Sequence, residues 1–197
     1  MNKKILLPIL AIAIMAVMLL SITLATGELA NKNAQQEHLW VMQQLLPGSE
    51  NFTVEPYDGE DANIRSVHKG ETGFVIETVT RGYAGDIVML IGVRNDGTVC
   101  GLTIRDMQET PGLGMSALNN SEFLLQFLNT EGGVAIGTPG EDAFSGATGS
   151  DTVETETYVD GISGATVTSK AIARCVNSAV AYVTGADVDS GATSWGG

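Results

Sequence analysis

The residues best suited to chemistry form a single stretch near the carboxyl end of the chain, Asp160–Ser169 (DGISGATVTS). This stretch is rich in glycine and hydroxyl groups. The residues after it, 170–183, carry apolar side chains at helical spacing. Free N–H groups in the first turn of a helix and the positive end of its dipole attract anions, so the stretch predicts a phosphate site. The same ten residues also fit a capped helix start that binds nothing.

A second stretch, Glu109–Gly114 (ETPGLG), has the composition of a rigid turn. Pro111 fixes its own φ angle, and Gly112 and Gly114 allow another group to approach the backbone closely. The stretch is therefore suited to form a wall against a flat ligand. Taken alone, such a stretch is more often just an ordinary turn.

The chain also contains a near-copy of the first stretch, Asp142–Thr148 (DAFSGAT), in which an acidic residue again stands six positions before a threonine. The hydroxyl group of Thr148 is therefore a rival to that of Thr166. Residues 149–154 begin with glycine, a helix breaker, and add acidic side chains, so they supply neither a helix dipole nor a cation. We favour Thr166 as the functional threonine.

The sequence gives little support for a metal site or for a nucleophile activated by histidine. His38 and His68 are the only histidines, and neither belongs to a ligand-like cluster, so we expect no catalytic residue and no metal site. Cys100 and Cys175 are expected to be small buried residues, with a disulfide as the alternative in an oxidising compartment. The chain has no P-loop, no dinucleotide-binding fingerprint and no cysteine cluster for iron and sulfur.

The elements that must position these stretches are predicted from hydrophobic periodicity. An antiparallel sheet is expected, because short alternating runs are separated by turn residues at 52–57, 64–68, 74–80, 86–94 and 98–105. Asn95-Asp96-Gly97 predicts a tight hairpin between the last two runs. Within the run at 86–94 the apolar side chains that share one face are Ile87, Met89, Ile91 and Val93, so we expect a sheet packed on one face.

Helices are predicted at 28–46, 116–128 and 170–183. Pro47-Gly48 should end the first helix, and Ser116 or Asn120 should cap the second. The segment 132–158 is rich in glycine, threonine, serine and acidic residues and is not assigned to any element. The expected fold class is α+β, with one amino-terminal transmembrane helix followed by an antiparallel sheet packed with helices.

The amino terminus reads as a membrane anchor. Lys3 and Lys4 precede an uncharged run from Ile5 to Gly27, which at about 1.5 Å per residue is long enough for a bilayer core of about 30 Å. A cleaved signal peptide is the alternative, although its apolar region is normally shorter. The two lysines predict a cytoplasmic amino terminus and an extracytoplasmic domain. All 23 acidic residues lie beyond Gly27 within a chain of net charge −13, which argues against nucleic acid as a partner.

Glu109–Gly114, Asp160–Thr166 and the amino-terminal run together make the chain resemble the flavin-binding G subunit of the Rnf electron-transport complex. The resemblance to the C subunit of sodium-translocating NADH:quinone reductase is nearly as good. Arg81–Gly85 (RGYAG) and the Asn95-Asp96-Gly97 hairpin add less specific support. The resemblance extends from Ile5 to about Val183.

This resemblance implies a covalent FMN joined through its phosphate to the hydroxyl group of Thr166. A separate flavin transferase that uses FAD and magnesium would attach it. Self-modification is not expected, because the loop before Thr166 offers no His or Lys as a base. Leu113, Met115 and Tyr83 are candidates for contact with the flavin ring. The predicted cofactor-binding residues are Asp160, Ser163, Gly164, Ala165, Thr166, Val167, Thr168 and Lys170, together with Glu109, Thr110, Gly112 and Leu113.

The expected organisation is a cytoplasmic tip and transmembrane anchor at 1–27, a stalk helix at 28–48, a covalent-FMN-binding domain at 49–184 and a loose tail at 185–197. The resemblance implies a flavoprotein subunit in the cell membrane that relays electrons within an ion-translocating ferredoxin:NAD oxidoreductase. Its partners would be the other membrane and peripheral subunits, and alone it should not turn over. The alternatives are the C subunit of the quinone reductase and an extracytoplasmic binding domain without a redox role.

Overall fold

The structure is a computed structural model that describes residues 3–59, 61–110, 121–131, 133–137, 144–145 and 155–185. The chain divides into two compact units, residues 1–41 and residues 42–197. Most of the first unit is helix α1 (Lys3–Leu45), which ends in the second unit. The predicted stop is confirmed, because the helix ends just before Pro47 and Gly48, where Gly48 has a φ of 91°. Among the side chains described, no helix is long and apolar enough to cross a membrane.

The second unit is built on a five-stranded antiparallel sheet in which each strand pairs with the next one along the chain. The strands confirm the five predicted runs and are β1 (Thr53–Glu55), β2 (Ile64–Lys69), β3 (Gly73–Arg81), β4 (Asp86–Arg94) and β5 (Val99–Met107). The predicted hairpin joins β4 to β5: the N–H group of Arg94 donates to the carbonyl of Thr98 at 2.9 Å, and Gly97 has a φ of 90°. Only glycine takes that backbone conformation without strain.

A second sheet lies in the segment that the sequence left unassigned. Its strands are β6 (Gly133–Ile136), β7 (Phe144–Ser145) and β8 (Thr155–Val159). Strand β6 is central, antiparallel to β7 and parallel to β8. The fold class is therefore α+β as expected, but with two sheets in place of one.

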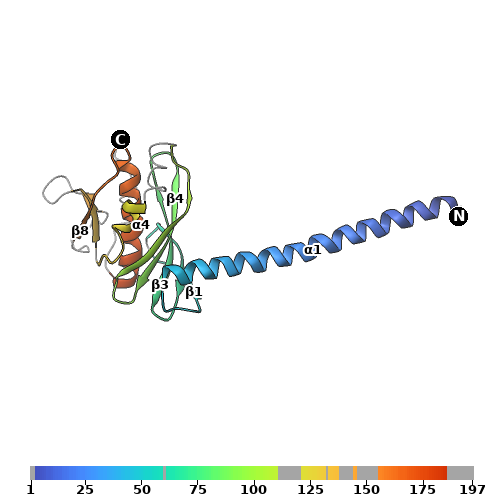
Figure 1. Cartoon of the computed structure of the whole chain (residues 1–197), viewed down its shortest axis with the longest axis horizontal. Helices are drawn as coiled ribbons and strands as arrows, with labels where there is room; N and C mark the ends of the chain where they lie inside the picture. The colour runs from blue at the N-terminus through green and yellow to red at the C-terminus, as the bar shows by residue number, and fades with distance from the viewer. Residues whose placement is uncertain are drawn as a thin grey trace. The chain divides into compact units, whose positions relative to one another are not determined.

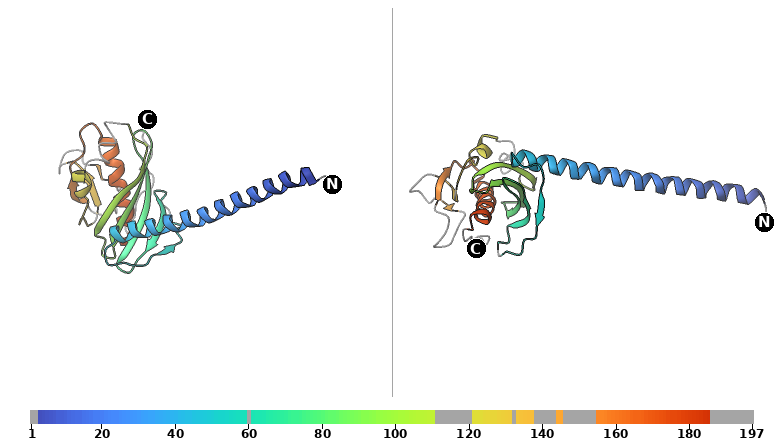
Figure 2. Two further views of the ribbon diagram at one scale, coloured as in Figure 1. Left: turned by 45° about the vertical axis from the view of Figure 1, so that its right-hand side comes forward. Right: turned by 90° about the horizontal axis from the view of Figure 1, so that it is seen from below.

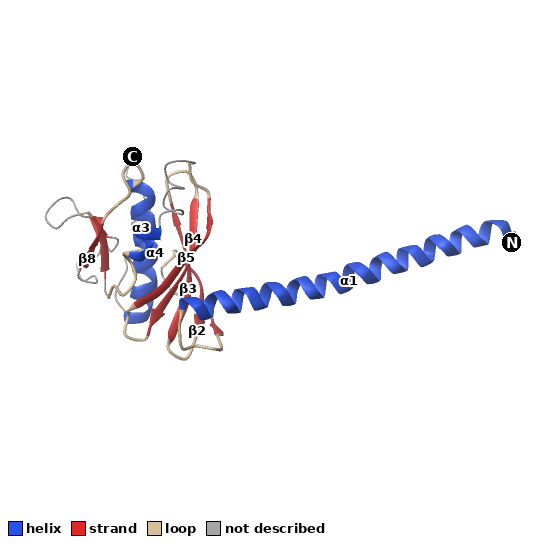
Figure 3. Ribbon diagram, in the orientation of Figure 1, coloured by secondary structure: helices blue, strands red, loops and turns tan. Residues whose placement is uncertain are grey.

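Helix α4 (Thr166–Thr184) lies between the two sheets (Figures 1 and 3), and the views in Figure 2 agree. Every residue from Ala171 to Ala181 is buried, which is unusual for a helix unless it is covered on all sides. A single hydrophobic core includes Ile91 from β4, Ile172 from α4 and Ile136 from β6. The predicted carboxyl-terminal helix is thus confirmed, and it forms the middle layer of the domain.

Helix α3 (Ser121–Leu125) is the described part of the helix expected at 116–128. Its proposed caps, Ser116 and Asn120, lie outside the described residues. After Leu125 the chain forms turns and reaches Asn129, whose φ of 61° ends the helical path. Phe123 and Phe127 are both fully packed in the core, edge to face with ring centroids 5.2 Å apart.

The prediction that the sheet packs on one face only is wrong for β4. Ile87, Met89, Ile91 and Val93 face the common core as expected, but Val88, Leu90 and Gly92 on the opposite face are buried too. The last turn of α1 covers part of that face: a Cβ atom at Gly92 would overlap the carbonyl oxygen of Leu45. Local alternation could not reveal this cover, because it comes from a segment some 45 residues earlier in the chain.

Candidate functional site

The predicted phosphate turn is the start of α4, and Thr166 is the first residue of that helix. Ala165 occupies the N-cap position with a φ of −127° and makes no side-chain cap. The first helical hydrogen bond runs from the N–H group of Ser169 to the carbonyl of Ala165 at 2.9 Å. The N–H groups of Thr166, Val167 and Thr168 therefore precede the helical ladder and are available to an anion.

Ser169 stabilises the turn through two hydrogen bonds of its hydroxyl group. It is fully buried, and its hydroxyl group donates to the carbonyl of Ala165 at 3.0 Å and accepts from the N–H group of Ile162 at 3.1 Å. Gly164 within this turn has a φ of 79°, a left-handed conformation that favours glycine. The turn is thus fixed by its own residues without any contribution from a capping side chain at Ala165.

The approach to the turn is held by the segment just after α3 and by the second sheet. Gln126 accepts from the N–H group of Asp160 at 2.9 Å and donates to its carbonyl at 3.5 Å, while the side chain of Asp160 is exposed. Gly161 packs closely on β6, since a Cβ atom there would lie 2.8 Å from Cγ2 of Ile136. Sequence reasoning found neither contact, because both join segments that are far apart in the chain.

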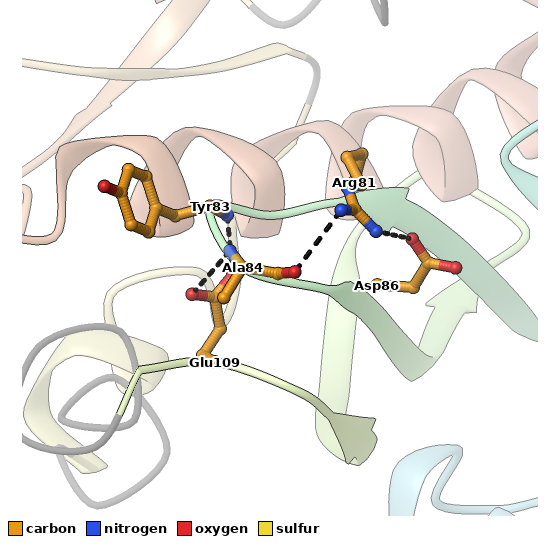
Figure 4. Close-up of polar contacts among 5 residues, drawn as sticks. All are labelled: Arg81, Tyr83, Ala84, Asp86 and Glu109. Carbon is orange, nitrogen blue, oxygen red and sulfur yellow. Dashed lines mark hydrogen bonds and ion pairs between the residues drawn. The ribbon is translucent and has the colours of Figure 1, made fainter.

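The opposite wall is formed by Glu109 and the turn between β3 and β4. The carboxylate of Glu109 is buried, with 7% of the residue exposed, and accepts from the N–H groups of Tyr83 at 2.7 Å and Ala84 at 3.3 Å (Figure 4). A Cβ atom at Gly82 would overlap Oε1 of Glu109, so a larger residue there would have to displace that carboxylate. Of the stretch predicted to form a wall, Glu109 and Thr110 are described and residues 111–114 lie outside the described ranges. The hydrogen bonds of Glu109 to this turn are not predicted by the sequence.

On the far side of the same turn, Arg81 forms an ion pair with Asp86 at 3.2 Å and donates to the carbonyl of Ala84 at 3.3 Å (Figure 4). Both side chains of the ion pair are more than half exposed, so the pair adds little to stability. Its hydrogen bond to Ala84 nevertheless gives the turn a second fixed point.

The helix start and the Glu109 wall meet in a pocket of about 370 Å³. Its lining residues are Tyr83, Glu109, Gly164, Ala165, Thr166, Val167 and Thr168. A second pocket of about 320 Å³ shares Tyr83 and Val167 with the first and adds Arg81 and Gly82. Both volumes fall in the range of small-molecule sites, which is roughly 300–1,000 Å³.

The structure thus brings together six of the twelve predicted site residues: Glu109, Gly164, Ala165, Thr166, Val167 and Thr168. Asp160, Ser163, Lys170 and Thr110 are nearby in sequence but do not line the pocket. Gly112 and Leu113 lie outside the described residues, as do Met115 and the rival acceptor Thr148.

The residues present fit a phosphate attached at Thr166. The Thr166 side chain is exposed at the pocket, and the N–H groups beside it carry the positive end of a helix of 19 residues. Within the described ranges, no cluster of three His, Cys, Asp or Glu side chains could hold a metal ion. The arrangement can therefore bind an anion through backbone donors, with a hydroxyl group in reach.

The two cysteines are free, so the alternative of a disulfide between them is wrong. Cys175 is buried and Cys100 half-buried, and burial raises the pKa of both thiol groups. A raised pKa keeps each sulfur protonated and unreactive near neutral pH. Neither cysteine is an activated nucleophile.

Sequence comparisons with known proteins relate the chain to flavin-binding proteins. The model of the FMN-binding domain family matches residues 82–181, which run from the Gly82 turn to the buried part of α4. A Methanosarcina acetivorans protein, named as the G subunit of an ion-translocating oxidoreductase complex, is 30% identical over 193 residues, covering 91% of this chain and 93% of its own.

Two further relatives match over shorter stretches. The G subunit of the Na(+)-translocating ferredoxin:NAD(+) oxidoreductase complex of Acetobacterium woodii is 34% identical over 111 residues, 55% of this chain and 47% of its own. The G subunit of the ion-translocating oxidoreductase complex of Vibrio cholerae is 33% identical over 114 residues, 57% of this chain and 50% of its own. The match thus spans about half the length of these two relatives. Together with the full-length match and the family model, it shows that the chain belongs to the FMN-binding domain family that includes the G subunits of ion-translocating oxidoreductase complexes.

Proposed function

We propose that this chain is the flavin-carrying G subunit of an Rnf-type ion-translocating oxidoreductase and that its FMN is esterified to Thr166. The observation that carries the proposal is the position of Thr166: an exposed hydroxyl group on the first residue of α4, inside a pocket of ligand size. Relatives that are named as the G subunits of such complexes support the wider function.

Within this proposal the residues of the pocket have separate roles. The N–H groups of Val167 and Thr168 would hold the phosphodiester, and Ser169 would keep the turn in the conformation that presents them. Lys170 follows one turn further on and adds a positive charge near the phosphate. Exposed Asp160 would be read or positioned by the flavin transferase. FMN itself supplies the redox chemistry, accepting and passing on electrons.

A separate flavin transferase is part of the proposal, because the described lining of the pocket offers no free base for Thr166. Among the lining residues that the structure describes there is no histidine and no lysine, and the carboxylate of Glu109 already accepts from two N–H groups. The transferase would join the Thr166 oxygen to the FMN phosphorus of FAD while the bond from that phosphorus to the bridging oxygen of the diphosphate breaks. AMP would leave with the bridging oxygen, and a base of the transferase would take the hydroxyl proton.

The proposal also places the chain in the cell membrane, with residues 1–27 as a single anchor, 28–48 as a stalk and 49–184 as an extracytoplasmic FMN-binding domain. The uncharged run after Lys3 and Lys4 supports an anchor with a cytoplasmic amino terminus. A covalent bond suits that location, because a flavin that dissociated outside the cytoplasm would be lost. Other membrane and peripheral subunits would be the partners.

The covalent site is tested by mass and fluorescence of the chain purified from its own membranes. We expect one FMN phosphoryl unit in the intact mass and flavin fluorescence that stays with the chain in a denaturing gel. Thr166→Val keeps the shape of the side chain but lacks the hydroxyl group, so it should abolish both signals, whereas Thr166→Ser should retain them.

Thr148→Val is the matched control, since Thr148 is preceded by the same motif. It should leave the mass and the fluorescence unchanged. Flavin that survives in Thr166→Val and disappears in Thr148→Val would move the assignment to Thr148. A wild-type chain without flavin, from cells that contain the transferase, would instead favour an extracytoplasmic binding domain without a redox role.

The reaction class is tested on the whole complex. An Rnf-type complex should transfer electrons between reduced ferredoxin and NAD, in a manner that needs the Thr166 flavin. Electron transfer from NADH to a quinone without any requirement for ferredoxin would assign the chain to the quinone reductase instead.

A further inference from the structure

Tyr83 is an aromatic residue in an unusual position. Its side chain is exposed, with 69% of the residue accessible, yet its backbone N–H group donates a short hydrogen bond of 2.7 Å to the buried carboxylate of Glu109. It lines both the pocket at Thr166 and the neighbouring pocket at Arg81, and among the described lining residues the two pockets also share Val167. A large exposed ring between two adjoining pockets is suited to cover a flat ligand that extends from one into the other.

The backbone under this ring is fixed by three independent contacts. Glu109 accepts from the N–H groups of Tyr83 and Ala84, Gly82 donates to the carbonyl of Gly85 at 2.8 Å, and Arg81 donates to the carbonyl of Ala84 (Figure 4). The bond from Tyr83 to the carboxylate is charge-assisted and short at 2.7 Å. Exposure of the Tyr83 ring therefore does not mean that its point of attachment is loose.

Charge decides which end of a ligand such as FMN lies near this wall. Glu109 is negatively charged and lines the same pocket as Thr166, while the helix start on the opposite side offers N–H groups and the positive end of a dipole. A phosphate is attracted to the helix and repelled by Glu109. The uncharged ring system is then left for the Tyr83 side of the two pockets.

We propose that the phenol ring of Tyr83 stacks on one face of the flavin ring, and that Glu109 is the positioning residue that holds Tyr83 there. This inference rests on the proposed function, because it requires FMN at Thr166. Beyond the proposed function, the inference identifies the described side chain that contacts the flavin ring and the residue that holds that side chain in place.

Fluorescence of the attached flavin reports the stacking directly. An excited flavin is a strong oxidant, so a phenol in van der Waals contact gives it one electron and takes the same electron back, which returns both groups to their starting state without emission. Contact with Tyr83 therefore shortens the fluorescence lifetime, and the effect is lost when the ring is removed or displaced.

The experiment measures the flavin lifetime of the full chain in its own membranes or in detergent. We expect a largely quenched flavin in the wild type and a lifetime at least threefold longer in Tyr83→Leu. Tyr83→Phe keeps the shape of the ring but is hard to oxidise, so it should fold and load as the wild type does and also show the longer lifetime. Tyr83→Trp restores an oxidisable ring and should remain quenched.

Tyr158→Leu is the matched control, because Tyr158 is also an exposed tyrosine, at 38%, but lies on β8 and lines neither pocket. Its lifetime should equal that of the wild type. An unchanged lifetime in both Tyr83→Leu and Tyr83→Phe overturns the proposal while leaving a flavin on the protein. A wild-type chain with no flavin would overturn the proposed function itself, so the two failures are distinguishable.

The role of Glu109 is tested by Glu109→Gln and by Gly82→Ala, which perturb the same contact from its two sides. The glutamine cannot accept two charge-assisted bonds, and the added methyl group would displace the carboxylate. Both variants should keep the covalent flavin and lengthen its lifetime at least twofold. If the lifetime stays at the wild-type value although the midpoint of unfolding falls, Glu109 has only a structural role and its assignment as a positioning residue is wrong.

Discussion

At the scale of single residues, buried hydrogen bonds between side chains and distant backbone groups hold the site together. Asn177 of α4 illustrates this best. Its amide accepts from the N–H group of Val134 at 2.8 Å and donates to the carbonyl of the same residue at 2.9 Å, and it is 3% exposed. One side chain therefore satisfies both backbone groups of a residue in β6, the strand on which Gly161 packs. The Asn177 contact thus helps to position the turn before Thr166.

We expect Asn177→Leu to lower the free energy of unfolding by about 2–4 kcal/mol, because it leaves two buried backbone groups of Val134 without partners. Chemical denaturation of the wild type and the variant would measure this difference. Asn51→Leu is the control: Asn51 is exposed and its side chain makes only a long contact of 3.4 Å with Glu71. That change should stay within about 0.5 kcal/mol, and an equal effect of the two substitutions would contradict the assignment.

At the scale of elements, the junction between α1 and the sheet shows how closely two backbones can pack. Gly92 and Gly101 are partners on β4 and β5, and a Cβ atom at Gly101 would lie 2.6 Å from the carbonyl oxygen of Leu45. The thiol group of Cys100 donates to that same carbonyl at 3.2 Å. The end of the helix thus packs on two glycines, and its last carbonyl accepts a hydrogen bond from the side chain of Cys100.

We expect Gly92→Ala to displace the last turn of α1, because its methyl group would overlap the Leu45 carbonyl, at a cost of about 1–3 kcal/mol. Hydrogen exchange should become faster at residues 42–46. Gly185→Ala is the comparison: Gly185 has a φ of 73° but open space around it, so it costs about 1–2 kcal/mol through backbone strain. It should leave exchange at 42–46 as it was. Unchanged exchange in Gly92→Ala would show that the junction is not held by close packing.

The sequence predicts those elements whose signals are local. Alternating residues and the Asn95-Asp96-Gly97 turn are sufficient for β3, β4 and β5. The apolar spacing at 170–183 is sufficient to predict α4, although the helix begins four residues earlier, at Thr166. Local residue patterns do not predict the second sheet. Its central strand pairs in parallel with a strand about 20 residues later, and such a pairing produces no characteristic alternation of residues within either strand.

The candidate site follows the same division. The turn that leads into Thr166 is predicted from glycine and hydroxyl residues, which act through their own backbone. The hydrogen bonds of Glu109 to Tyr83 and Ala84 are not predicted, since they join residues 25 and 26 positions apart through a buried carboxylate. The alternation in β4 likewise predicts one buried face, whereas the cover on the other face is supplied by the end of α1.

At the scale of the whole molecule, the proposed anchor is the feature that most determines where the protein works. The uncharged run after Lys3 and Lys4 lies in α1, and Ile14 and Met18 are described there with 60% and 65% of each residue exposed. Exposed apolar side chains in such a run are stable when lipid surrounds them. The acidic composition of the remaining chain should keep the domain itself in water.

We expect the full chain to remain in the membrane pellet after an alkaline carbonate wash. The double variant Ile14→Arg, Met18→Arg should appear in the supernatant, since each charge at the centre of a span costs about 2.5–3.5 kcal/mol. Trp40→Arg is the control, because Trp40 is equally exposed, at 61%, on the same helix but outside the apolar run. It should stay in the pellet. Release of the wild-type chain by the wash would exclude a retained anchor.

The burial of α4 between two sheets has a mechanical consequence. A helix covered on all sides cannot slide or tilt without opening the core, so its first residue is a stationary point of the domain. A group attached at Thr166 would therefore have one end at a fixed position, and its reach would be limited by the length of its own tether and by the contact proposed with Tyr83. For a carrier between partners, any change in the distance of electron transfer would then come from the tether and not from motion of the fold.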